Sequence, residues 1–284
     1  MIMFPNGYLI LLAVSLALCC IGFYRFVWFM SVGYGFSVAG LGISLLVMSL
    51  VRGQFSILFA GLCALMVIYG LRLGLFLFIR EMKNVKYREK MKEAGGDMKV
   101  PVFVGAFMWI FCGVIYVFQS SGAVYRLLNN ADVNAALIIG SIISAAGIAI
   151  EALADRQKSD AKEMNPDMPA MHGLYKMCRC PNYFGEITFW TGLFITGIGA
   201  IKGSQWIPAV LGYIEIVFVM LSGAKRVETR HIKHYGKIAE YNEYADKTPL
   251  LFPLIPIYHV TNEEKIAAEE AAKKAKAEKR SKNS

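Results

Sequence analysis

Four ionisable side chains interrupt segments that are otherwise apolar, and residues of this kind could support chemistry. They are Arg72, Glu151, Glu186 and Glu215. A charge inside a bilayer is costly, so an ionisable residue there marks a candidate site. In "VIYGLRLGLFLFIRE", Arg72 follows Tyr69 by three residues and therefore shares its helical face. One interpretation is an arginine that reaches the membrane surface, a role that Arg80 already suits. The interpretation that we favour is a buried anion-binding group.

Two pairs of polar residues, each four positions apart, occur where apolar segments meet charged loops. Glu151 and Asp155 share one helical face, as do Asn182 and Glu186. The first pair fits either the water-exposed end of a helix or a polar ligand. Asn182 could simply cap a helix that begins near Pro181, but Glu186 lies more than a turn inside that helix. A ligand amide or ribose that donates to these side chains is the sharper interpretation of the second pair.

Glu215 lies in the middle of the apolar segment "VLGYIEIVFVML". An isolated carboxylate would not stay ionised there, so Glu215 is either protonated or paired, and Arg72 is one candidate partner. Cys178 and Cys180 form a C-x-C pair, but no second pair of Cys or His follows at the spacing of a zinc site. We therefore predict no metal site.

The elements that must position these residues are membrane helices. The chain has 284 residues, 56% of them hydrophobic, and a mean hydropathy of +0.46, which is too apolar for an ordinary soluble domain. Uncharged stretches near the roughly 20 residues that span a bilayer are 1–24, 26–51, 53–71, 100–125 and 133–150. Two further spans, about 182–201 and 203–224, each carry one acid. We predict an all-α, polytopic integral membrane protein with about seven transmembrane helices.

Positive charge is concentrated in a few loops. The net charge is +9, and seven Lys or Arg lie in 80–99, five lie in 156–179, and more follow residue 224. Cytoplasmic loops carry such an excess, so we place these segments and the C-terminus in the cytoplasm and the N-terminus outside. The basic excess is then a topology signal, and we expect no nucleic acid partner. We divide the chain into a membrane domain, 1–256, and a charged cytoplasmic tail, 257–284, which opens with a capping box at Thr261 and Glu264.

The segment "GLYKMCRCPNYFGEITFW", which contains Asn182 and Glu186, is similar to the C-terminal signature of the steroid 5-alpha-reductase family, including its bacterial branch. Three more segments agree with that family in order and spacing, and they are "EALADRQ" (151–157), "RHIKHYGKIAEYNEYADKTPLLFP" (230–253) and "RLGLFLFIRE" (72–81). The resemblance covers roughly residues 60–256. The chain departs from the family at Cys180, where the family has His. It also lacks an early Gln-Glu pair, because no acidic residue precedes Glu81.

Members of that family use a seven-helix membrane fold and NADPH to reduce an activated carbon–carbon double bond. The resemblance implies that the nicotinamide half of the cofactor is held by Arg179, Asn182 and Glu186. It assigns the ribose and phosphates to Arg72, Asp155, Lys162, His231, Tyr235 and Tyr244. Glu151 and Tyr175 lie in the same motifs and complete the predicted cofactor-binding set.

The resemblance also implies which groups act on the substrate. Tyr69 occupies the position of the family tyrosine that donates a hydrogen bond to the substrate carbonyl. A protonated Glu215 could supply a second donor in place of the missing Gln-Glu pair. The substrate is expected to be apolar, a 3-oxo-4-ene steroid or a related sterol or lipid enone. We expect a monomer in the bacterial inner membrane.

Two other interpretations remain open. The same superfamily contains isoprenylcysteine carboxyl methyltransferases, which share R-H-P-x-Y-x-G and bind S-adenosylmethionine. Here N-Y-F-G-E together with E-x-x-x-D-x-Q favours NADPH over that cofactor. The second alternative is a non-enzymatic membrane scaffold with a decayed cofactor site. The missing Gln-Glu pair is compatible with a scaffold, whereas the retention of the other polar elements argues against it.

Overall fold

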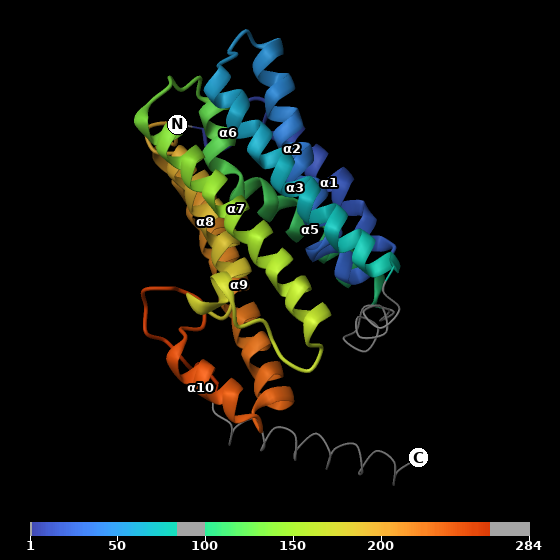
Figure 1. The fold of residues 1–284 in the computed structure, drawn as a ribbon. Coiled ribbons are helices and arrows are strands. Elements are labelled where there is room, and N and C mark those ends of the chain that lie inside the picture. Colours follow the sequence, from blue (N-terminus) through green and yellow to red (C-terminus); the bar gives the residue numbers. More distant parts are fainter. Residues whose placement is uncertain (1, 84–99, 262–284) are drawn as a thin grey trace. The chain divides into compact units, whose positions relative to one another are not determined.

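The computed structural model describes residues 2–83 and 100–261, which form helices and contain no strand (Figure 1). The protein is thus all-helical in the part that is described. The helices are α1 (Tyr8–Cys19), α2 (Val32–Val51), α3 (Ile57–Lys83), α5 (Val102–Gln119), α6 (Ser121–Leu128), α7 (Ala135–Met164), α8 (Pro181–Thr196), α9 (Trp206–Tyr235) and α10 (Ala239–Lys247). Short 3-10 segments are Cys20–Phe23, Phe26–Met30, Gly173–Lys176 and Gly203–Gln205.

Several of these helices are long and apolar enough to cross a membrane, so the chain is a multi-pass integral membrane protein. Among the described residues, five segments meet this condition: Phe26–Val51, Ile57–Arg80, Val102–Gln119, Ala135–Met164 and Gly203–Tyr235. The other two predicted spans are shorter helices, Tyr8–Phe23 and the 16-residue α8. A helix of that length rises about 24 Å, less than the roughly 30 Å of a hydrocarbon core. That these two helices also cross the membrane, which would give seven spans in all, stays a prediction.

Helices α7 and α9 continue well past the apolar stretches that predict them, and each is 30 residues long. The sequence suggests that one helix could end near Glu151 and Asp155, but α7 runs on to Met164, so the interpretation as a helix end is wrong. The extension contains an i,i+4 pair, Arg156 with Asp160, whose charged atoms lie 3.9 Å apart. Polar sequence can therefore continue a helix beyond the apolar segment.

The chain groups into two compact units. Unit 1 comprises the described residues of Met1–Ala146 with Thr188–Ile216, and unit 2 comprises those of Gly147–Ile187 with Val217–Ser284. Helices α7, α8 and α9 contribute to both units, because a boundary falls inside each of them. The predicted division at residue 256 stays a prediction. Most of the tail, including Glu264 of the expected capping box, and residues 84–99 of the basic loop lie outside the described residues.

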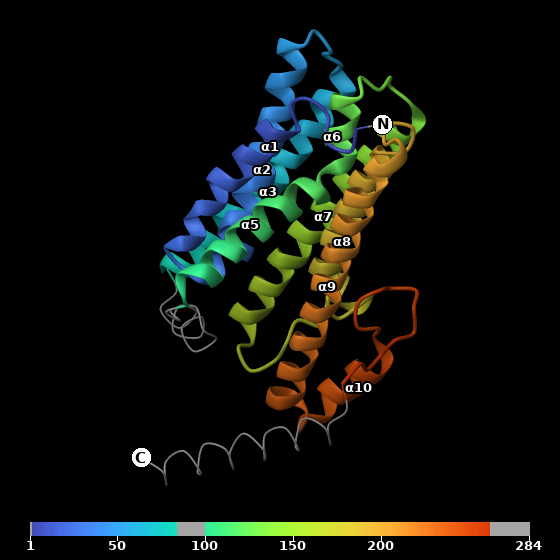
Figure 2. The same ribbon diagram turned by 180° about the vertical axis from the view of Figure 1, so that it is seen from behind.

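In unit 1, glycines allow α2 and α3 to lie side by side at close range (Figures 1 and 2). A Cβ on Gly70 would lie 2.4 Å from the carbonyl oxygen of Gly35, and a Cβ on Gly35 would lie 2.6 Å from the nitrogen of Gly74. Close backbone approach supplies van der Waals packing where lipid provides no hydrophobic drive between helices. It also brings Tyr34 of α2 against Tyr69 of α3.

In unit 2, two glycines of the "GLYKMCRCPNYFGE" segment fix its position on α7. A Cβ on Gly185 of α8 would lie 2.6 Å from the backbone nitrogen of Glu151. Gly173 has φ +62°, a left-handed conformation that favours glycine, and a Cβ there would lie 2.5 Å from the Gln157 amide. Both positions therefore require glycine, and together they hold the start of α8 and the segment before it against α7.

Candidate functional site

Unit 2 contains a pocket at the point where α7, α9 and the start of α8 meet. Five of the predicted cofactor residues line it, and they are Lys162, Tyr175, Arg179, Asn182 and His231. Lys158, Cys180 and Tyr183 also contribute to its wall. The pocket is narrow, with a volume of about 30 Å³, so it admits one small polar group rather than an extended ligand. We call it the unit 2 pocket.

The wall of this pocket is basic. Lys158, Lys162 and Arg179 line it, and none of the described lining residues is a carboxylate, although Glu228 pairs with Arg179 from outside the lining. Cys180, the residue in the place of the family His, is buried, and burial raises the pKa of its thiol to about 12. The thiol is therefore neutral at physiological pH. The pocket has the electrostatic character of an anion site.

Lys162 connects three segments at one side of the pocket. Its ammonium donates to the Tyr235 hydroxyl, 2.7 Å away, and to the Pro166 carbonyl, 2.9 Å away. The structure thus brings two predicted phosphate-binding residues, one on α7 and one on the last turn of α9, into direct contact. An ammonium has three N–H donors, and these two bonds occupy two of them.

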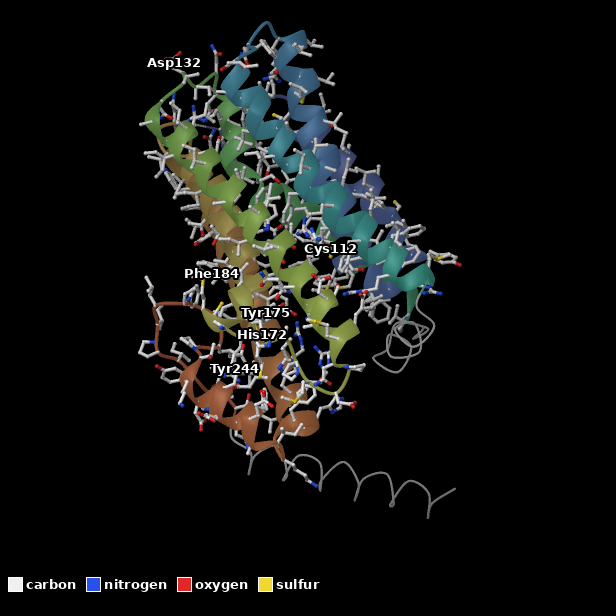
Figure 3. All side chains as sticks on the ribbon, viewed as in Figure 1. Cys112, Asp132, His172, Tyr175, Phe184 and Tyr244 are labelled. Carbon is white, nitrogen blue, oxygen red and sulfur yellow. The ribbon has the colours of Figure 1, made fainter. Side chains whose placement is uncertain are left out.

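Tyr175 lines the pocket and is buried. Its hydroxyl donates to the Ala154 carbonyl at 3.3 Å, and its own carbonyl accepts from the Tyr244 hydroxyl at 2.6 Å (Figure 3). Burial raises the pKa of both tyrosines, and the nearby Asp155 carboxylate raises that of Tyr175 further. Tyr175 and Tyr244 are therefore neutral, and both are engaged with backbone oxygens.

Gln157 is a positioning residue that sequence reasoning did not select. Its side-chain oxygen accepts a hydrogen bond from the Leu174 nitrogen at 2.9 Å, next to Gly173 with its left-handed backbone. Gln157 is the last residue of the E-x-x-x-D-x-Q pattern. The motif therefore contained it, but the family resemblance gave it no role. Gln157 sets the 3-10 segment that carries Tyr175 into the pocket.

Arg179 has a structural partner that the sequence did not reveal. Its Nη2 lies 3.0 Å from Glu228 Oε1 and also donates to the Tyr258 carbonyl, and both charged side chains are almost fully buried. Glu228 further accepts from the Val260 nitrogen at 3.0 Å and the Thr261 hydroxyl at 2.9 Å. Arg179 Nε is buried and has no hydrogen bond among the described residues. One edge of the guanidinium thus holds the chain after α10, and its Nε remains without a bond among the described residues.

The three carboxylates predicted near the cofactor lie in the same unit but do not line the pocket. Glu151 and Glu186 are both buried, whereas Asp155 is partly buried and acts on Tyr175 as described above. Asn182 is half-buried and lines the pocket, and its side chain has no hydrogen bond to another described residue. The predicted i,i+4 pair is therefore divided, with Asn182 in the pocket wall and Glu186 outside it.

The remaining predicted residues, Tyr69, Arg72 and Glu215, belong to unit 1. Tyr69 is fully buried and its hydroxyl lies 2.9 Å from that of Tyr34. Glu215 Oε2 accepts a hydrogen bond from Gln119 Nε2 at 2.6 Å, so Gln119 is a partner that the sequence did not reveal, and the pairing with Arg72 stays a prediction. Gln119 is 96 residues away in sequence, at the end of α5, which explains why no local pattern pointed to it.

Fold and site together define an all-helical, multi-pass membrane protein with a basic pocket built on α7, α8 and α9. Residues 25–248 match the family described as a protein of unknown function (DUF1295), and the chain belongs to that family. No curated protein and no solved structure matches the chain.

Proposed function

We propose that this protein is an NADPH-dependent membrane reductase that saturates an activated carbon–carbon double bond in an apolar substrate. A 3-oxo-4-ene steroid or a related sterol or lipid enone is the substrate class that the motifs favour. The observation that carries the proposal is the unit 2 pocket, where Arg179, Asn182 and His231 converge from the two segments that resemble the steroid 5-alpha-reductase family. The basic loops favour an inner-membrane protein with this pocket towards the cytoplasm.

The pocket residues fit the anionic part of such a cofactor. Arg179 Nε is an orphaned buried donor, Lys162 retains one N–H, and the Asn182 amide faces the same space. Arginine and lysine are the usual partners of phosphate oxygens. Because the pocket is narrow, we assign it to a phosphate or ribose group of NADPH and not to the whole dinucleotide.

The charge of the pocket also argues against the methyltransferase alternative. S-adenosylmethionine carries a sulfonium and an ammonium besides its one carboxylate, so its net charge is positive, whereas NADPH is strongly anionic. The described lining has two lysines and an arginine and no carboxylate side chain. Like charges in a partly buried site repel, so a cationic cofactor is disfavoured there.

When bound, NADPH would supply the hydride for the β-carbon of an enone. The negative charge that develops on the carbonyl oxygen would then need hydrogen-bond donors. Tyr69 is the proposed donor to that oxygen, and its burial favours a strong hydrogen bond because the local dielectric is low. Glu215, held by Gln119, is the proposed second donor when protonated.

The test is a melting curve of the purified full-length protein in detergent with and without NADPH. A ligand at a hundredfold excess over its Kd raises stability by about 2.7 kcal/mol. We expect this shift for the wild type and its loss in Asn182→Ala, with S-adenosylmethionine producing no shift. An unchanged wild-type curve at millimolar NADPH would show that the proposal is wrong.

A second experiment measures the reaction itself. Oxidation of NADPH by the reconstituted protein should depend on an added 3-oxo-4-ene steroid and should fall about a hundred- to a thousandfold in Tyr69→Phe. NADPH should still shift the melting curve of that variant. Near-wild-type turnover by Tyr69→Phe would remove Tyr69 from the mechanism.

A further inference from the structure

Three buried aromatic residues of unit 1 form a chain of hydrogen bonds. The indole Nε1 of Trp190 on α8 donates to the Tyr34 hydroxyl on α2 at 2.6 Å. The Tyr34 hydroxyl lies 2.9 Å from the Tyr69 hydroxyl on α3. All three side chains are buried, with 6% exposure or less. Three helices thus place their polar atoms in one series.

The chemistry of its first member gives this chain a direction. An indole N–H can only donate, so the Tyr34 oxygen accepts from Trp190. Either hydroxyl could donate in the Tyr34–Tyr69 bond, but the bond from Trp190 favours Tyr34 as the donor, because a hydroxyl that already accepts a hydrogen bond donates more strongly. Tyr69 then directs its own proton away from Tyr34. A hydroxyl that accepts one hydrogen bond becomes a stronger donor in the next, because bonds in a chain polarise one another.

The surrounding rings hold the end of the chain in place. Phe189 stacks on Tyr69 with centroids 3.9 Å apart and an angle of 9° between the rings. The Phe189 carbonyl accepts from the Ser144 hydroxyl at 3.0 Å, which ties this part of α8 to α7 within the same unit. A fixed ring with a fixed acceptor leaves the Tyr69 hydroxyl little freedom, as a preorganised donor requires.

We propose that Trp190 and Tyr34 are positioning residues that orient and strengthen the Tyr69 hydroxyl as the donor to a substrate carbonyl. This inference rests on the proposed function and deepens it, because it names two groups that set the polarisation of the enone. Neither residue touches the substrate. Their effect on an enone passes through Tyr69 alone.

A neighbouring tyrosine offers a matched control. Tyr116 lies in the same cluster, 5.1 Å from Tyr34 between ring centroids, but its hydroxyl donates to the Phe29 carbonyl at 2.7 Å. Tyr116→Phe therefore removes a buried hydroxyl from the same region without interrupting the chain. Any loss that is common to Tyr34→Phe and Tyr116→Phe reflects packing.

The kinetic experiment compares kcat and KM of the reconstituted protein for enone reduction. Tyr34→Phe should lower kcat about tenfold, less than the direct donor Tyr69, with KM within about twofold. Trp190→Phe should have little further effect in the Tyr34→Phe background, because the two act in series. Tyr116→Phe should stay within about twofold of wild type. Equal kcat values for Tyr34→Phe and Tyr116→Phe, or fully additive losses, would overturn the proposal.

An infrared measurement separates this inference from the proposed activity. A 3-oxo-4-ene steroid labelled with ¹³C at its carbonyl should show a lowered carbonyl stretch when it is bound to the wild type and to Tyr116→Phe. In Tyr34→Phe the band should move back towards its value in an apolar solvent. If the wild type shows that band shift without NADPH oxidation, only the reductase proposal fails. If turnover occurs while Tyr34→Phe shows the wild-type band, or if the wild type shows no shift, the positioning role is wrong.

Discussion

Two buried arginines, one in each unit, show how differently the units use a positive charge. In unit 1, Arg126 donates to the carbonyls of Thr196 at 3.0 Å and Asp132 at 2.6 Å, and to the Asn134 side chain at 2.8 Å. In unit 2, Arg179 is paired with the Glu228 carboxylate and retains an unbonded Nε beside the basic pocket. Every guanidinium nitrogen of Arg126 donates to an oxygen of unit 1, whereas Arg179 combines a structural bond with a donor that a ligand can use.

The largest effect should come from breaking the Arg179–Glu228 pair. Glu228→Ala leaves a buried guanidinium without its counter-charge and releases the bonds to Val260 and Thr261, which we expect to cost about 3–5 kcal/mol of stability. Chemical denaturation in detergent measures this. Glu243→Ala removes an exposed carboxylate that pairs with Lys247, and it should leave the midpoint unchanged. Similar midpoints for the two variants would contradict the assigned role of Glu228.

A smaller loss should follow removal of the unit 1 arginine. Arg126→Ala leaves the Thr196 and Asp132 carbonyls without their donor, which should cost about 2–3 kcal/mol. The comparison becomes sharper if this variant, although less stable, binds NADPH as the wild type does. A loss of NADPH affinity in Arg126→Ala that matches the loss in Asn182→Ala would break the distinction between the two arginines.

The smallest effect concerns the pH dependence of unit 2. Burial raises the pKa of Cys180 from its usual 9 to about 12, so the folded protein keeps this proton while the unfolded chain loses it. Stability must then fall as the pH rises from about 9 towards 12, by about 1 kcal/mol between pH 9 and 10. Denaturation midpoints of wild type and Cys180→Ala should converge over this range. Parallel pH profiles would show that the thiol does not carry this effect.

The sequence was sufficient for features that depend on local pattern. Apolar runs predicted the membrane helices α2, α3 and α5, and Pro181 correctly marked the first residue of α8. The polar extension of α7 was not predicted, because hydropathy reports the membrane segment and not the length of the helix. The predicted division into a membrane domain, 1–256, and a tail, 257–284, stays a prediction.

The candidate site was predicted in part, and the reason lies in sequence separation. The order of two motifs along the chain suggested that their residues share a site, and residues of both motifs line the pocket. Glu228 was missed because an acid inside "KRVETRHIK" has the pattern of a solvated charged face. The bond between Trp190 and Tyr34 joins residues 156 positions apart, and no periodicity within one helix can reveal such a contact.

The central claim, that the basic pocket of unit 2 holds an anionic part of NADPH, is tested most directly by equilibrium binding of radiolabelled NADPH to the full-length protein. Lys162→Ala removes an ammonium from the pocket wall, whereas Lys247→Ala removes an exposed lysine of α10 that pairs with Glu243. We predict at least about a tenfold rise in Kd for Lys162→Ala, equivalent to about 1.4 kcal/mol, and an unchanged Kd for Lys247→Ala. Equal affinities in the two variants, or wild-type binding of S-adenosylmethionine in place of NADPH, would contradict the account.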